Sequence, residues 1–338
     1  MQLAGEKIER MERLADSRGV IGAAAMDQRG SLQKALKKHK GDADVPQSDM
    51  EEFKVAIAKH LTPHASAILL DPEFGLPASK QRAKNAGLLL AYEKSGYDNT
   101  RPGRLPDLLT DWTVRKLVEQ GADAIKLLLY YTPFDQPAVN AEKHSFVERV
   151  GVECAFHNVP FFLEFVGYDP EGGDEKGPEY AKKKPAVVTG SISEFSKPYY
   201  HVDMLKVEIP VNLQYVEGAR SFKGPAAYSK AEALDLYRKA AEAAKKPFIY
   251  LSAGVSNDQF LESLEMAAEA KTGFNGVLCG RATWQEGIPV YAKDGNQALE
   301  DWLAKTGVSN IQALNERLKP ATAWYEKYGA KSAAELKG

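Results

Sequence analysis

Four charged side chains and one serine lie within or at the ends of apolar runs of this sequence. They are Asp27, Lys126, Glu164, Lys206 and Ser252. Two lysines and a carboxylate that converge in one protein interior would be costly to desolvate unless they served a purpose. The chemistry that such a set supports is an amine nucleophile next to a proton carrier.

An amine of this kind predicts covalent chemistry on a carbonyl group. A lysine is nucleophilic only when neutral, and burial and a nearby second cation both favour the neutral form. Lys126, if it faces Lys206, would be that cation. The amine of Lys206 would attack a ketone and form an iminium ion, an electron sink that permits cleavage of a nearby carbon–carbon bond. Glu164 would carry the protons, and the route needs no metal or other cofactor.

Taken singly, each of these residues also has a purely structural interpretation. Lys126 or Glu164 could lie at the surface or in an inward ion pair. Asp27 could cap a helix or lie in a turn before QRG, and Ser252 could simply end a strand. Only the combination favours a site.

The segment 203–210, DMLKVEIP, gives Lys206 a direction. Side chains of a strand alternate between two faces, so Lys206 shares a face with Met204 and Glu208. The opposite face is apolar, and its members are Leu205, Val207 and Ile209. We therefore expect Lys206 to point inward, with Glu208 either as its ion-pair partner or as a second proton carrier.

Eight short apolar runs predict the strands that position these residues. They span residues 20–27, 65–71, 87–93, 122–130, 159–168, 202–210, 247–254 and 274–282. Amphipathic stretches separate most of them, including 48–61, 105–121, 229–246 and 257–271. Alternating strands and helices indicate parallel βαβ units, and eight of them predict an α/β (β/α)₈ TIM barrel.

The barrel is expected to be a single domain over residues 1–338, with an N-terminal helix and closing helices at the C-terminus. An open doubly wound sheet is the alternative, but no G-x-G-x-x-G loop follows the first strand. Catalytic groups of a TIM barrel lie at the C-terminal ends of its strands, where the five polar residues fall.

The last two strands predict a phosphate site. They end in LSAGVS and LCGRATW, and the loops after strands seven and eight often bind phosphate in such barrels. Ser252, Gly254 and Gly280 would offer a hydroxyl and backbone N–H groups, and Arg281 a charge-assisted contact. The alternative is two ordinary turns with Arg281 at the surface.

Composition excludes several other classes of protein. The 338 residues carry a formal net charge of −2 and no basic block, so neither nucleic acid nor a membrane surface is an expected partner. No apolar run approaches the length of a membrane span, and the charged N-terminus predicts no secretory signal. Two cysteines and six scattered histidines predict no metal site, and we expect a cytoplasmic protein.

Several motifs together resemble the class I, Schiff-base tagatose-1,6-bisphosphate aldolases. They are AMDQRG, LLDPEFGLPA, GLLLAYEKSGYD, GADAIKLLLYY, VPFFLEFVGYD, LKVEIPVN, YLSAGVS and FNGVLCGRATW, and the resemblance runs from about residue 5 to residue 325. The stretch 169–200 departs most from the family and is a candidate lid or peripheral loop.

The resemblance implies a role for each residue. Lys206 is the Schiff-base lysine, Glu164 the proton carrier, and Lys126 and Asp27 contact substrate hydroxyls and tune the amine. The resemblance also places Gln28 near the substrate and Ser252, Leu278, Gly280 and Arg281 near its phosphate. Gly254 is added to this phosphate site from the LSAGVS motif alone.

The implied substrates are ketose bisphosphates and triose phosphates, handled by a homo-oligomer. Fructose 1,6-bisphosphate is an alternative to the tagatose epimer. Two further alternatives are an isomerase or epimerase with Glu164 as base, and a sugar-phosphate-binding protein without catalysis.

Overall fold

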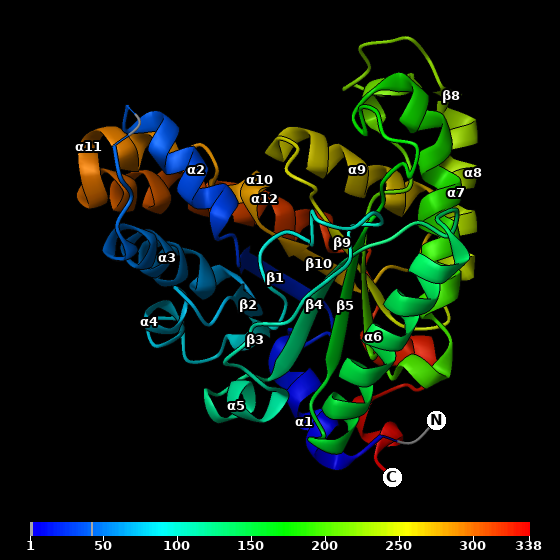
Figure 1. The fold of residues 1–338 in the computed structure, drawn as a ribbon, viewed down its shortest axis with the longest axis horizontal. Coiled ribbons are helices and arrows are strands. Elements are labelled where there is room, and N and C mark those ends of the chain that lie inside the picture. The colour runs from blue at the N-terminus through cyan, green and yellow to red at the C-terminus, as the bar shows by residue number, and fades with distance from the viewer. Residues whose placement is uncertain (1–2, 42) are drawn as a thin grey trace.

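Eight parallel strands form a closed barrel, which confirms the predicted TIM-barrel fold (Figure 1). The computed structural model describes residues 3–41 and 43–338. Around the barrel the strands are β1 (Ile21–Met26), β10 (Gly276–Cys279), β9 (Phe248–Leu251), β6 (Met204–Val207), β5 (Phe161–Val166), β4 (Ala124–Tyr130), β3 (Gly87–Ala91) and β2 (Ala67–Leu70). Each lies within one of the eight predicted runs.

Helices surround this barrel (Figure 1). They are α1 (Gly5–Leu14), α2 (Gly30–His39), α3 (Gln47–Leu61), α4 (Leu76–Ser79), α5 (Val114–Glu119), α6 (Pro137–Phe156), α7 (Pro178–Phe195), α8 (Lys230–Ala243), α9 (Asn257–Glu269), α10 (Arg281–Trp284), α11 (Gly287–Trp302) and α12 (Val308–Arg317). The predicted stretch 105–121 is helical only in α5. Ser229 caps α8 through a capping box with Glu232, which fixes where that helix starts.

Strand alternation divides the core as the sequence predicts. Met204 belongs to the cluster inside the barrel together with Phe162 and Ile249. Leu205 and Val207 belong to the other cluster, which lies between the strands and the helices. Apolar side chains therefore fill the interior of the barrel. The inward-facing polar groups lie next to this apolar layer, on the side of the C-terminal ends of the strands.

The opposite end of the barrel is closed by the two ends of the chain. Helix α1 buries Ile8 and Leu14 there, and Trp324 packs in the same interior cluster. Leu3 N donates to Leu336 O at 2.8 Å, so the first and last described segments lie side by side (Figure 1).

Two features between strands differ from the expectation. The stretch 169–200 is mostly helix α7, which packs against α8 in the outer ring, so the prediction of a loop is wrong over most of its length, while a role as a lid stays a prediction. A pair of two-residue strands, β7 (Val216–Glu217) and β8 (Tyr228–Ser229), lies between β6 and α8 and was not predicted.

Candidate active site

A cavity of about 670 Å³ opens at the C-terminal ends of the barrel strands. All ten predicted site residues line it. They are Asp27, Gln28, Lys126, Glu164, Lys206, Ser252, Gly254, Leu278, Gly280 and Arg281. The structure therefore brings the predicted set together, while the catalytic and binding roles of its members stay predictions.

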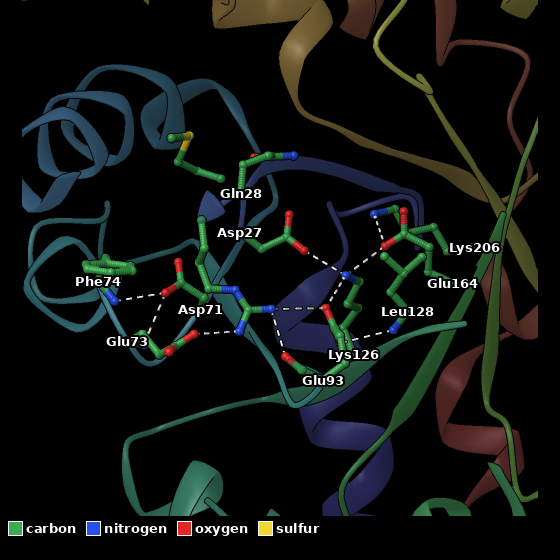
Figure 2. A network of polar contacts seen from close by, with 12 residues as sticks. Asp27, Gln28, Asp71, Glu73, Phe74, Glu93, Lys126, Leu128, Glu164 and Lys206 are labelled. Carbon is green, nitrogen blue, oxygen red and sulfur yellow. Dashed lines mark hydrogen bonds and ion pairs between the residues drawn. The ribbon is translucent and has the colours of Figure 1, made fainter. Parts of the chain in front are cut away.

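Lys126 is the centre of the charged group at the floor of this cavity (Figure 2). Its side chain is 1% exposed, and its Nζ lies 2.7 Å from Asp27 Oδ2, 2.8 Å from Glu93 Oε1 and 2.9 Å from Glu164 Oε2. Burial alone would lower the pKa of Lys126, but the three carboxylates outweigh it and hold that pKa well above its usual value. Lys126 is therefore positively charged near neutral pH.

Lys206 lies next to this cation but is not in direct contact with it. Its Nζ is 2.8 Å from Glu164 Oε2, the oxygen that also pairs with Lys126 (Figure 2). The sequence predicted that Lys126, if it faces Lys206, would be the nearby second cation. The two amines share one carboxylate oxygen that lies between them, because two buried cations need shared anionic charge.

Glu164 is ionised in this arrangement. Burial raises the pKa of its carboxyl, but Lys126 and Lys206 outweigh that effect and hold the pKa below its ordinary value. An ionised carboxylate 2.8 Å from an amine is placed to accept a proton from it.

Asp27 follows β1, and a buried lysine in α3 holds the backbone on both sides of it. Lys54 is fully buried, and its Nζ donates to Met26 O at 2.9 Å and to Gln28 O at 2.8 Å, one on each side of Asp27. Asp71 is the anionic partner of Lys54. The cap of α2 is Arg29, so the alternative interpretation of Asp27 as a helix cap is wrong.

The electrostatics of Asp27 match those of Glu164. Burial raises the pKa of Asp27, but Lys126 and Lys206 outweigh it and hold that pKa far below the usual carboxyl range. Asp27 and Glu164 are therefore both charged near neutral pH.

The opposite wall of the cavity carries the predicted phosphate residues. Gly254 has φ +75°, a backbone conformation that favours glycine, and a Cβ atom on it would lie 2.6 Å from the Arg281 guanidinium carbon and would push that group away. Arg281 is solvent-exposed, yet its guanidinium lies against the loop that contains Ser252 and Gly254. The side chain of Leu278 belongs to the barrel interior below.

Glu208 does not pair with Lys206. Its Oε2 accepts from Gly167 N at 2.7 Å, and its Oε1 lies 3.0 Å from Lys184 Nζ in α7. This carboxylate ties the end of β6 to β5 and α7, so its observed contacts are those of a structural residue.

Two buried charged residues of the site were not predicted from the sequence. Glu93 pairs with Lys126, and Arg29 donates to the backbone carbonyl of Glu93 at 2.7 Å. A signal for Glu93 was present, because it ends the predicted run 87–93 as Asp27 ends the run 20–27. Arg29 follows Asp27 and Gln28 in QRG and carried no separate signal.

Some kinds of site are not found in the described part of the chain. Across residues 3–41 and 43–338, no group of three or more His, Cys, Asp or Glu side chains is arranged to hold a metal ion. In the same ranges, no helix combines the length and the apolar character needed to cross a bilayer.

The fold and the site together define a TIM-barrel enzyme whose centre is a buried amine next to a carboxylate. Residues 21–286 match the sequence model of the DeoC/LacD family aldolases, which covers more than half of the chain. This chain belongs to that family.

Named relatives extend the similarity over nearly the full length. Tagatose 1,6-diphosphate aldolase 2 of Enterococcus faecalis is 51% identical over 325 residues, which cover 96% of this chain and 97% of the relative. Tagatose 1,6-diphosphate aldolase of Listeria monocytogenes is 46% identical over 331 residues, which cover 98% of this chain and 97% of the relative.

A solved structure supports the fold. Fructose-bisphosphate aldolase from Plasmodium falciparum superimposes with a TM-score of 0.68 over 94% of this chain and 97% of that chain. The two sequences are 13% identical, so this similarity concerns the fold alone.

Proposed function

We propose that this chain cleaves D-tagatose 1,6-bisphosphate reversibly to dihydroxyacetone phosphate and D-glyceraldehyde 3-phosphate. The observation that carries the proposal is the amine of Lys206, 4% exposed and 2.8 Å from an ionised Glu164, at the floor of an open cavity. The names of the relatives supply the substrate. All 338 residues would act as one catalytic domain.

The proposed reaction begins when Glu164 accepts a proton from the ammonium of Lys206. The neutral amine adds to the C2 ketone, and the resulting carbinolamine takes the proton back from Glu164 and loses water to give an iminium ion. The C3–C4 bond then breaks as the ionised Glu164 accepts the proton of the C4 hydroxyl. The bonding electrons move toward the iminium to leave an enamine on Lys206, and the C4 fragment departs as the aldehyde. Protonation at C3 and hydrolysis release dihydroxyacetone phosphate and regenerate the amine.

Lys126 would support this sequence without taking part in covalent chemistry. Its charge is fixed by three carboxylates that match its three N–H donors, so it would hold Glu164 in place and would contact a substrate hydroxyl only in exchange for one of these pairs. Asp27 would accept from a substrate hydroxyl on the same side of the cavity.

The phosphate on the dihydroxyacetone side would bind at Arg281. The guanidinium and the loop that contains Ser252 and Gly254 offer donors of the type that phosphate prefers. Gln28 would contribute a sugar contact, since its Oε1 is buried and has no hydrogen-bond partner among the described residues. Gly280 leaves room for that side chain, because a Cβ there would lie 3.3 Å from Gln28 Nε2.

A trapping experiment tests the covalent step. Borohydride reduction in the presence of dihydroxyacetone phosphate should inactivate the protein and add the mass of the reduced triose phosphate at Lys206. A label on another residue, or no label, would contradict the proposal. Substantial turnover by Lys206→Met on a ketose phosphate would instead favour the isomerase or epimerase alternative.

Kinetics on two epimers test the substrate. The value of kcat/KM should be higher for tagatose 1,6-bisphosphate than for fructose 1,6-bisphosphate and should be unchanged by EDTA. Tight binding without turnover on either sugar would favour the sugar-phosphate-binding alternative. A homo-oligomer and a cytoplasmic location stay predictions, and analytical ultracentrifugation tests the first.

A further inference from the structure

Glu93 is a buried carboxylate with both oxygens engaged, and the proposed reaction gives it no task. It is 3% exposed; its Oε1 pairs with Lys126 at 2.8 Å, and its Oε2 accepts from Leu128 N at 3.0 Å (Figure 2). Strand β3 ends at Ala91, while β4 continues past Leu128. The carboxylate thus supplies an acceptor where β3 no longer runs beside β4.

Arg29 holds Glu93 from the other side. It is 5% exposed, its Nη2 donates to the carbonyl oxygen of Glu93 at 2.7 Å, and the same nitrogen lies 3.7 Å from Glu93 Oε1. Its Nη1 pairs with Glu73 at 2.7 Å. Asp71 in turn accepts from the backbone N–H of Glu73 and Phe74, so the loop after β2 fixes Arg29 (Figure 2).

The buried charges of this group balance. Three cations, Arg29, Lys126 and Lys206, face three carboxylates, Asp27, Glu93 and Glu164. Burial would lower the pKa of Arg29, but its carboxylate neighbours outweigh this and raise it, so this cation is constant. Removing Glu93 would leave one uncompensated positive charge next to Glu164.

We propose that Glu93, held by Arg29, is a positioning residue that aims the Lys126 ammonium and sets the charge that Glu164 experiences during catalysis. Glu93 acts through Lys126 and not on the substrate. The inference rests on the proposed function, since it assigns Glu164 the role of proton carrier.

Glu93→Gln separates charge from shape. Glutamine keeps the length and can still accept from Leu128 N, but it has no charge. The charged groups that face Glu93 are Lys126 on β4, Arg29 before α2, Asp27 after β1 and Glu164 on β5, with Glu73 behind Arg29. Without the negative charge, Glu164 holds its proton less tightly.

The expected result is a shifted pH profile. In Glu93→Gln the acid limb of kcat/KM should move to lower pH by about one unit. The kcat at neutral pH should fall roughly tenfold, while KM stays within about twofold. An unshifted limb, or a raised KM with unchanged kcat, would overturn the proposal.

Two further variants sharpen the test. Arg29→Gln removes a cation from the same group, so its acid limb should move to higher pH, the opposite direction. Glu93→Asp keeps the charge but shortens the reach, so its limb should stay near that of the parent while kcat falls. If Glu93→Gln does not fold, Arg29→Gln alone decides. An acid limb of kcat/KM that does not move to higher pH in Arg29→Gln then overturns the proposal.

The matched control is Glu262→Gln. Glu262 is 4% exposed and accepts from the backbone N–H groups of Arg220 and Ser221, away from the cavity. This variant should be destabilised without a change in pH profile, and a shift equal to that of Glu93→Gln would overturn the proposal.

Borohydride trapping on the parent protein distinguishes a failure of the proposed function from a failure of the inference on Glu93. No adduct at Lys206 overturns the proposed function, whereas an adduct with an unshifted Glu93→Gln profile overturns only the inference on Glu93.

Discussion

The two ends of the barrel both contain buried lysine–carboxylate pairs, but they use them differently. At the closed end, Lys7 Nζ lies 2.9 Å from Asp203 Oδ2, and that oxygen also accepts from Phe161 N at 2.9 Å. Asp123 likewise pairs with Arg13 and accepts from Leu88 N. These aspartates precede β6 and β4 and satisfy the N–H groups where neighbouring strands begin.

At the open end, the charged groups face a cavity and each other. Lys126 contacts three carboxylates, and Glu164 Oε2 contacts two amines. The comparison shows that burial of an ion pair does not by itself mark a catalytic site. Charge shared among several groups next to open space is the distinguishing feature.

The largest expected difference between the ends concerns the two buried lysines. Lys126→Met should lower kcat for cleavage of tagatose 1,6-bisphosphate by at least roughly 10³-fold, because Glu164 loses its fixed cationic partner. Lys7→Met, the matched variant at the closed end, should keep kcat within about twofold. Comparable losses in the two variants, with folding checked by circular dichroism, would contradict the comparison.

Arginines give the next largest contrast. Arg281→Ala should raise KM about 10- to 100-fold and change kcat little, since a charge-assisted contact to phosphate is lost. Arg18→Ala at the closed end, where Arg18 pairs with Asp16, is the control and should leave both constants unchanged. Steady-state kinetics on the bisphosphate measures both, and a fall in kcat alone for Arg281→Ala would argue against phosphate binding.

Asp203→Asn should act on stability alone. The amide oxygen can still accept from Phe161 N, but the charge that pairs with Lys7 is gone. The free energy of unfolding should fall by about 1–3 kcal/mol, with kcat preserved. Urea denaturation tests this, and loss of activity in the folded variant would mean that the closed end also serves catalysis.

The smallest expected effect is on the pH dependence of stability. The folded-state pKa values of Asp27 and Glu164 are lowered, so their contribution is present above the ordinary carboxyl range and is lost as the pH falls through the lowered values. Below about pH 4, the free energy of unfolding of the parent should therefore fall more steeply than that of Glu164→Gln, which lacks one of these groups. Equal slopes in urea titrations would contradict this.

The barrel and the direction of Lys206 were predictable because both depend on local alternation. Each strand carries its own period-two pattern, and Lys206 shares its face with the interior Met204. The line-up of Asp27, Lys126 and Glu164 follows from the rule that the C-terminal ends of barrel strands meet.

The partners within the site were less predictable, because pairing depends on distances across the barrel. Lys126 was expected to face Lys206 as a nearby second cation, but the carboxylate oxygen that both amines share, Glu164 Oε2, was not predicted. Glu208 was linked to Lys206 by parity, but it lies beyond the end of β6, where alternation no longer applies, and it pairs with Lys184 instead. Helix α7 in the stretch 169–200 was hidden by charged and glycine-rich residues before it.

Lys54 has a consequence for how the cavity responds to a ligand. Its three bonds, to Met26 O, Gln28 O and Asp71, fix the chain on both sides of Asp27 before any sugar arrives. Little conformational entropy should then be lost at Asp27 when a ligand binds, because the loop is already ordered. The contacts made there should therefore contribute fully to the free energy of binding. Amide hydrogens near Asp27 should accordingly exchange slowly in the ligand-free protein as well as in the complex.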